Sequence, residues 1–128
     1  MMLVKTRISP STIEGLGCFA CEAVKPGTPV WSFSDLIDTV VYKTKSELSK
    51  HTKSHGIEYR DCYVVAGDSA LFLNHSPAPN LKHCENGEPF GVFVCCAEIA
   101  AGEEMVFDYG PDDAAFDTPQ PVDSNVAA

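Results

Sequence analysis

Three short stretches of this chain hold residue types that can bind ligands or do chemistry, and the first is rich in glycine. Residues 15–20 read Gly-Leu-Gly-Cys-Phe-Ala, which matches the G-x-G-x-x-A spacing of dinucleotide-binding loops. Such a loop needs a following helix whose N-terminus faces the pyrophosphate. Pro26 and Gly27 come too soon to leave room for that helix. The spacing therefore indicates a tight turn, or a close backbone approach to some other ligand, and argues against nicotinamide binding.

The second and third stretches combine polar or aromatic side chains with strand-like runs. Residues 73–80 read Leu-Asn-His-Ser-Pro-Ala-Pro-Asn, so three polar side chains follow an apolar run and two prolines exclude a helix. Polar groups beside a core need hydrogen-bond partners, so this segment is either a self-satisfied turn or a wall of a binding site. Residues 102–110 read Gly-Glu-Glu-Met-Val-Phe-Asp-Tyr-Gly. Taken alone, Tyr109 is also compatible with a packed ring whose hydroxyl reaches water.

Histidine and cysteine spacing gives weak support for a metal site. His51 and His55 are four residues apart and share a face of the expected helix, but no third ligand accompanies them. Cys18 and Cys21 have the spacing of half a zinc site, and no second well-spaced pair completes it. The six cysteines fit reduced thiols in a cytosol-like compartment. No metal site is predicted, and no signature of a cysteine–histidine hydrolase is present.

Taken together and in this order, the three stretches resemble the SET domain family of protein lysine methyltransferases. The resemblance extends over about residues 3–110, and the segment 30–33 after a Pro-Gly turn is similar to the early strand of compact members. It implies a mainly β fold of several short sheets, with a threaded, pseudoknot-like C-terminal segment and one short surface helix. It also implies that residues 1–110 form a single SET domain and that residues 111–128 form a tail, partly disordered.

The resemblance further implies an activity and the residues that carry it. The family transfers a methyl group from S-adenosylmethionine, leaving S-adenosylhomocysteine, to a lysine side chain that enters from the opposite face. Tyr109 matches the catalytic tyrosine, and Phe107 matches a position that influences how many methyl groups a lysine receives. Tyr59 is matched to an upstream tyrosine of the substrate channel. By position, the residues that bind the cofactor are Leu16, Gly17, Cys18, Phe19, Asn74, His75 and Tyr109.

The chain departs from the family pattern at a zinc site. Many members carry a cysteine after Asn-His-Ser that joins three downstream cysteines, whereas Pro77 stands at that place and no cysteine follows Cys96. We therefore expect neither this zinc module nor any other metal. One wall of the lysine channel then lacks its usual structure. Phe116, the only aromatic residue after Tyr109, is the candidate to close it, and a frayed tail is the alternative.

Short strands have to position these residues, because strand-like runs dominate the chain. We expect them at residues 3–8, 18–24, 30–33, 37–42, 63–66, 81–84, 90–96 and 105–109, with 70–73 either a strand or a helical turn. Asn86 and Gly87 indicate a hairpin. One helix is expected over residues 45–55, capped by Thr44 and followed by Gly56. Residues 21–30 and 96–105 share a pattern of strand, glycine turn and strand.

Composition narrows the partners. The 128 residues include 9 Lys and Arg against 18 Asp and Glu, a net charge of −9, so direct nucleic-acid binding, which needs clustered cations, is not expected. An acidic surface attracts basic, lysine-containing proteins, which would include histone-like substrates. The longest nearly uninterrupted apolar run, residues 90–97, is far shorter than the ~20 residues of a membrane span, so no membrane partner is expected either. No signal-like segment follows the first residues, so an intracellular location is expected, cytoplasmic or nuclear.

Two other functional classes stay open at this point. The chain could be a non-catalytic SET-like module that binds lysine-rich tails or a protein partner. It could also be a metal-binding regulatory protein that uses His51, His55 and cysteines. Retention of Tyr109 together with Asn74 and His75 favours the enzyme. Neither the substrate protein, the number of methyl groups transferred nor the presence of a homodimer follows from the sequence.

Overall fold

The computed structural model describes residues 1–44 and 49–109, and it is mainly β, as the sequence predicts. Its strands and helices are β1 (Thr6–Pro10), β2 (Leu16–Ala20), β3 (Pro29–Ser32), β4 (Thr39–Tyr42), α1 (Lys50–His55), β5 (Ile57–Tyr59), β6 (Cys62–Val65), the 3₁₀ helix η1 (Ser69–Phe72), β7 (Asn74–His75), β8 (Leu81–Cys84), β9 (Val92–Cys95) and β10 (Val106–Phe107).

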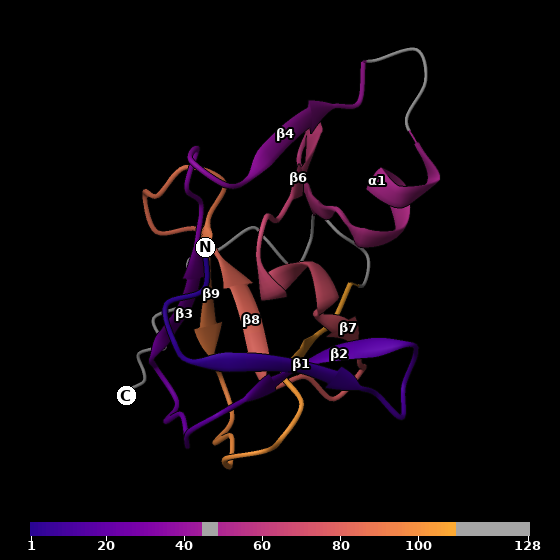
Figure 1. Ribbon diagram of the computed structural model, residues 1–128. Helices are drawn as coiled ribbons and strands as arrows, with labels where there is room; N and C mark the ends of the chain where they lie inside the picture. The colour runs from indigo at the N-terminus through magenta and orange to yellow at the C-terminus, as the bar shows by residue number, and fades with distance from the viewer. Residues whose placement is uncertain (45–48, 110–128) are drawn as a thin grey trace.

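The strands form three sheets of two, five and three strands. Their orders are β1-β2, β3-β9-β8-β10-β7 and β4-β6-β5. Figure 1 shows the three-stranded sheet with α1 in the upper part of the molecule and the β1–β2 hairpin crossing its lower part. The prediction of several short sheets and a single short α-helix is confirmed for the described residues.

Strand β10 is threaded between two strands that come earlier in the chain. It pairs in parallel with β7, where Val106 faces Asn74, and in parallel with β8, where Phe107 faces Leu81. The segment between β7 and β8 also contacts β10, because the Ser76 amide donates to the Phe107 carbonyl at 3.1 Å. The second and third chemically interesting stretches of the sequence are therefore neighbours in one sheet.

A buried asparagine fixes the threaded strand. Asn80 is 7 % exposed, its side-chain Oδ1 accepts from the Val106 amide at 2.9 Å, and its Nδ2 donates to the Glu104 carbonyl at 2.9 Å. Both polar ends of this buried amide are thus satisfied, as burial requires. Asn80 holds the chain on both sides of Met105.

The glycine-rich stretch lies against the segment that leads into β10. The Met105 amide donates to the Cys18 carbonyl at 2.8 Å, and Phe19 forms an isolated bridge with Glu104. The two segments that share a strand–turn–strand pattern also pair with each other, because Val24 and Ile99 exchange both backbone hydrogen bonds, at 2.8 and 3.0 Å. All three stretches therefore converge on one side of the core.

The core is built where the sheets meet. Trp31 of β3 and Phe93 of β9 are fully buried and pack edge to face, with ring centroids 5.6 Å apart. Burying one such side chain contributes roughly 1.5–3 kcal/mol. The other large side chains that are fully buried are Leu81, Ile99, Met105, Val30 and Val64. This core gives the short strands a rigid support.

The helix is shorter than expected and has a different cap. It spans Lys50–His55, and the Ser49 hydroxyl accepts from the Thr52 amide at 3.0 Å, so Ser49 and not Thr44 is the N-cap. Residues 45–48, where we expected the helix to begin, lie outside the described residues. Gly56 follows the helix as predicted, but in an extended conformation. A side chain there would meet the Thr52 carbonyl, so Gly56 is needed for space.

Several strand boundaries also differ from expectation. The first strand runs through Pro10 instead of ending at Ile8, because Pro10 is the last position of the β1–β2 ladder. Strands β5 and β7 were not expected, since three and two residues are too few for a visible pattern. Residues 70–73, left open between a strand and a helical turn, fall largely in η1.

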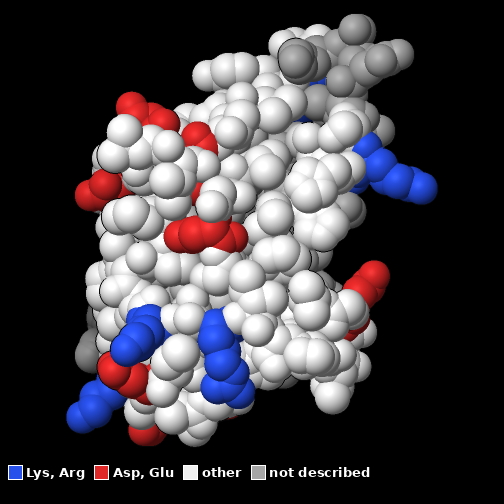
Figure 2. Space-filling view, in the orientation of Figure 1, with Lys and Arg blue, Asp and Glu red and all other residues white. Residues whose placement is uncertain are grey.

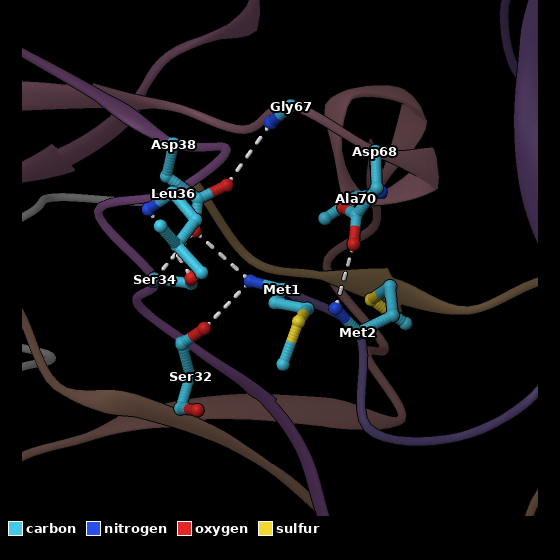
Figure 3. Close-up of polar contacts among 9 residues, drawn as sticks. All are labelled: Met1, Met2, Ser32, Ser34, Leu36, Asp38, Gly67, Asp68 and Ala70. Carbon is cyan, nitrogen blue, oxygen red and sulfur yellow. Dashed lines mark hydrogen bonds and ion pairs between the residues drawn. The ribbon is translucent and has the colours of Figure 1, made fainter.

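The N-terminal residues are tied to two aspartates (Figure 3). The Met1 ammonium donates to the Ser32 carbonyl at 2.6 Å and lies 3.0 Å from Asp38 Oδ2. The Met2 amide donates to Asp68 Oδ2 at 2.8 Å. The buried Asp38 carboxylate also accepts from the Gly67 amide at 3.0 Å, so it joins the loop before β4 to the turn before η1.

Charge is unevenly distributed over the surface. On the face drawn in Figure 2, Lys and Arg lie at the lower left and at the upper right, whereas Asp and Glu lie at the upper left, at the centre and among the lower basic side chains. No helix within residues 1–44 and 49–109 is both long and apolar enough to cross a membrane.

Candidate active site

Two glycines shape the hairpin at one side of the site, each for a different reason. Gly15 has φ +47°, a left-handed conformation that suits glycine, and its carbonyl accepts from the Ser11 amide at 2.8 Å. Gly17 is packed so tightly that a Cβ would lie 2.3 Å from Glu104 Oε2. The glycine-rich stretch thus contains a tight turn at Gly15 and a close contact at Gly17. The group that contacts Gly17 is the side chain of Glu104.

Asn74 ties β7 to the hairpin. Its Nδ2 lies 3.1 Å from the Leu16 carbonyl, 3.2 Å from the Glu14 carbonyl and 2.8 Å from Glu104 Oε2. Three oxygen acceptors around one atom identify it as the amide nitrogen on chemical grounds. Because the amide is planar, Asn74 Oδ1 points away from this acceptor cluster.

Tyr109 is held at two points by the second stretch. Its hydroxyl donates to the Leu73 carbonyl at 2.8 Å, and its main-chain amide donates to His75 Nδ1 at 3.0 Å. The phenol belongs to a partly exposed residue, yet burial, assisted by the negative charge of Glu14, raises the pKa of Tyr109 above its ordinary value. The hydroxyl is therefore a hydrogen-bond donor at neutral pH.

His75 also faces an acidic neighbour. Its Nδ1 lies 3.5 Å from Asp108 Oδ1, and both side chains are about half exposed. Since Nδ1 accepts the Tyr109 amide hydrogen, the ring proton of the neutral imidazole is on Nε2. The His75 and Tyr109 rings are also in contact, with centroids 5.1 Å apart.

A row of aromatic rings extends from Tyr109 through the sheet. Tyr109 contacts Phe107 at 4.7 Å, Phe107 contacts Phe93 at 4.7 Å, and Phe93 stacks on His83 at 4.5 Å between centroids. Tyr59 of β5 joins the far end of the row, 6.1 Å from His83. The two predicted channel residues Phe107 and Tyr59 are thus linked through the buried ring of Phe93 and the ring of His83, and no direct contact joins Tyr59 to Tyr109 among the described contacts.

His83 is a member of this row that sequence reasoning missed. Burial lowers the pKa of His83 to about 4, and its Nε2 donates to the Phe90 carbonyl at 2.8 Å. The imidazole is therefore neutral near pH 7. The alternation of Leu81 and His83 in β8 could have indicated an inward-facing position, but a histidine in an otherwise apolar row has no sequence signature.

The remaining predicted cofactor residues occupy different environments. Leu16 is exposed at the hairpin and Phe19 is partly buried beneath the Arg7 guanidinium, which lies 5.8 Å from its ring centroid. Cys18 differs, because its side chain is fully buried in the core and its carbonyl accepts the Met105 amide. Phe116 lies outside the described residues.

Metal-ligating side chains are not grouped in the part of the chain that the structure describes. There, no three His, Cys, Asp or Glu side chains are placed to hold a metal ion. His51 and His55 stack with ring centroids 4.7 Å apart, and the six cysteines are not joined in disulfides. The described residues therefore give no support to a metal-binding function.

With this geometry in place, comparison with known proteins gives the family. The SET domain family model matches residues 15–110. The chain belongs to the SET domain family. A curated relative from Plasmodium falciparum (isolate 3D7), named "Putative histone-lysine N-methyltransferase 1", is 26 % identical over 113 residues. That match covers 80 % of this chain but only 2 % of the relative's length.

Solved structures share the fold. The crystal structure of a Plasmodium falciparum protein, described as a putative histone methyltransferase, is 21 % identical with a TM-score of 0.61, covering 88 % of this chain and 99 % of the other. A humanized mutant of the Chaetomium thermophilum Polycomb Repressive Complex 2, bound to an inhibitor, contains a chain that is 22 % identical with a TM-score of 0.65. The match covers 84 % of this chain and 15 % of the other chain. The likeness to SET methyltransferases confirms the predicted fold.

Proposed function

We propose that this protein is a protein-lysine N-methyltransferase that takes its methyl group from S-adenosylmethionine and modifies a lysine of a basic, histone-like protein. The observation that carries the proposal is the threading of β10 between β7 and β8. It brings Tyr109 within hydrogen-bond distance of the segment Leu73–His75, while Asn74 reaches the glycine-rich hairpin. Membership in the SET family supports assigning this convergence to methyl transfer.

The residues beside Asn74 fit a cationic methyl donor. When bound, S-adenosylmethionine supplies a methyl group activated by a sulfonium, together with a positively charged amino group. The carbonyl oxygens of Glu14 and Leu16 and the carboxylate of Glu104 hold Asn74 Nδ2, which turns Asn74 Oδ1 away from the hairpin as an acceptor for that amino group. Oxygen acceptors are the groups that hold an ammonium. Asn74, His75 and the hairpin residues Leu16 to Phe19 would hold the donor.

The aromatic row suits the lysine substrate. Deprotonating a lysine of pKa about 10.4 at pH 7 costs about 4.6 kcal/mol, and a desolvated site lowers that cost because it disfavours the ammonium. The rings of Phe107 and Tyr109 are in contact, and their faces can also hold a cationic amine before it loses its proton. Phe116 is proposed to close the channel from the far side, although it lies outside the described residues.

Tyr109 acts in this proposal as an orienting group. Because the pKa of its phenol is raised, the hydroxyl is a poor base near pH 7 and a good hydrogen-bond donor. The bond from its hydroxyl to Leu73 and the bond from its main-chain amide to His75 fix the residue without further reorganisation during the reaction. Losing this hydroxyl should therefore slow turnover while leaving the donor bound.

The test is transfer of a labelled methyl group from S-adenosylmethionine to core histones and to proteins of a cell lysate, with the modified lysines read by mass spectrometry. Tyr109→Phe should lower turnover by about 100-fold or more, yet change donor affinity, measured by calorimetry, by less than about threefold. Tyr42→Phe, at an exposed tyrosine of β4, is the matched control and should match the wild type. Donor binding without any product would instead identify a non-catalytic module that binds lysine-rich tails.

A further inference from the structure

Glu104 has no assigned role, yet its side chain lies at the junction of the segments that form the site. Its carboxylate accepts from the Ser11 hydroxyl at 2.8 and 3.0 Å through its two oxygens. Its Oε2 accepts from Asn74 Nδ2 at 2.8 Å, and it fills the space above Gly17. One half-buried carboxylate therefore touches the β1–β2 turn, β2 and β7.

The second glycine of the hairpin is needed for this carboxylate. A Cβ at Gly17 would lie 2.3 Å from Glu104 Oε2, a distance that real Cβ atoms do not tolerate. The backbone bridge between Phe19 and Glu104 brings the two strands to this separation. Three features therefore fix the position of the carboxylate. They are the backbone pairing of Phe19 with Glu104, the space left by Gly17, and the donors Ser11 and Asn74.

We propose that Glu104 is a positioning residue of the methyl-donor site, which orients the Asn74 amide and supplies the negative charge that attracts the α-ammonium of the donor. The inference rests on the proposed function. Because Nδ2 of Asn74 is held by Glu104, its Oδ1 is turned away from the hairpin and is available as an acceptor on the donor side. Hydrogen bonds to a charged partner are about twice as strong as neutral ones, so the orientation depends on the carboxylate.

If the charge of Glu104 acts on the donor, its removal should affect ligands that carry an α-ammonium more than a ligand that lacks one. A purely structural role predicts no such difference. S-adenosylmethionine and S-adenosylhomocysteine both carry the α-ammonium, whereas 5′-methylthioadenosine has no amino-acid end. An isosteric Glu104→Gln change keeps the size of the side chain and its acceptor oxygen but removes the charge. It should weaken the binding of both ligands that carry the α-ammonium and leave the affinity for 5′-methylthioadenosine unchanged.

Calorimetric titration of the full chain with these three ligands tests the inference. In Glu104→Gln we expect the affinity for S-adenosylmethionine and S-adenosylhomocysteine to fall about tenfold, as the loss of one charge-assisted contact implies, and the affinity for 5′-methylthioadenosine to change less than twofold. Ser11→Ala removes the hydroxyl that donates to Glu104 but keeps the charge. Its affinity for S-adenosylmethionine should fall by less than about threefold. Glu103→Gln is the matched control, because that side chain is exposed and accepts from the Ala100 amide within its own turn.

The outcomes separate this inference from the function beneath it. If the wild type binds S-adenosylmethionine and Glu104→Gln binds it equally well, the role of Glu104 is overturned while the function stands. An equal loss for all three ligands, or an equal loss in Ser11→Ala, also overturns it, because either result means a scaffold defect. If the wild type binds none of the ligands, the proposed function fails together with this inference.

Discussion

Tyr109 and Phe107 show how single side chains divide the work at the proposed site. Tyr109 is fixed by two hydrogen bonds to residues that are 34 and 36 positions away in the chain. The side chain of Phe107 has no polar atom. It is held by ring contacts with Phe93 and Tyr109, with centroids 4.7 Å apart in both cases. The first can direct a reacting amine, whereas the second limits the space beside it.

Phe107→Tyr should restrict the number of methyl groups transferred. The added hydroxyl, close to Tyr109, can hold a water molecule where additional methyl groups must fit, so monomethyl-lysine should become the main product. Mass spectrometry of a modified peptide at increasing reaction times measures the mono-, di- and trimethyl fractions. Phe33→Tyr, at a partly buried ring that contacts Phe90, is a control outside the proposed channel. An unchanged product distribution would contradict the role of Phe107.

His83 predicts a loss of stability in mild acid. Its pKa is about 4 in the folded protein and about 6.5 when unfolded, so the unfolded state binds more protons between these values. The free energy of unfolding should therefore fall as the pH drops from 6.5 towards 4, by up to about 3 kcal/mol, and this contribution is fully present above pH 6.5. Urea unfolding at several pH values measures it.

His83→Phe is the comparison for that measurement. The substitution keeps a ring to stack on Phe93 but removes the titrating group, so the slope of stability against pH in this window should become shallower than in the wild type. Carboxylates titrate in both proteins, and the difference between the two curves isolates the histidine. Parallel curves would show that His83 is not the group responsible.

At the scale of elements, the two-residue strand β10 depends on the buried Asn80. A strand of two residues makes few ladder bonds, and here the Asn80 side chain adds one bond before Met105 and one after it. The parallel pairing on both sides of β10 brings together strands that are not neighbours in sequence. This arrangement positions Tyr109, which follows β10 by two residues.

Asn80→Ala should destabilise the fold and release this strand. A buried backbone amide and a partly buried backbone carbonyl would lose their partners, at about 1–3 kcal/mol each, so we expect about 2–5 kcal/mol less stability by denaturant unfolding. Hydrogen exchange should then rise first at the Val106 amide. Asn86→Ala, in the exposed hairpin loop, is the control and should change stability by about 0.5 kcal/mol or less. Similar losses in both variants would argue against a special role for Asn80.

At the scale of the whole molecule, net charge governs how the protein meets a substrate. The chain carries a net charge of −9, and Figure 2 shows acidic side chains over much of one face. Such a field attracts basic proteins from a distance and is screened by salt, since the Debye length is about 8 Å at 0.15 M. Substrate encounter, more than the chemical step, should respond to ionic strength.

Steady-state kinetics on a lysine-rich peptide should show this effect. Raising the salt from low to moderate concentration should increase KM about threefold or more, with little change in kcat. A peptide of the same length whose flanking Lys and Arg are replaced by Gln should show almost no salt dependence. Equal salt dependence for both peptides would exclude long-range steering.

Local patterns in the sequence were sufficient for the fold class and for part of the site. Short runs of β-branched, aromatic and other apolar residues indicated short strands, and the three stretches indicated the SET family, both of which are confirmed. The helix start and the short strands β5 and β7 could not be placed, because a few residues carry too little periodicity. Cys18 stays a prediction as a cofactor residue: its side chain faces the core, because a strand turns successive side chains to opposite faces, so any contact with a donor would come from its backbone.

What the sequence determined by itself is therefore the set of segments and their chemistry: a glycine hairpin, the Asn74-His75 pair and Tyr109. Only the tertiary structure decided which side chains meet, because the contacts that join these segments span from about 30 to more than 90 positions of chain. No local propensity encodes such distances. The contact of the Glu104 carboxylate with Gly17 depends on the pairing of distant segments, and His83 is neutral because its ring is buried against Phe93 of the neighbouring strand β9.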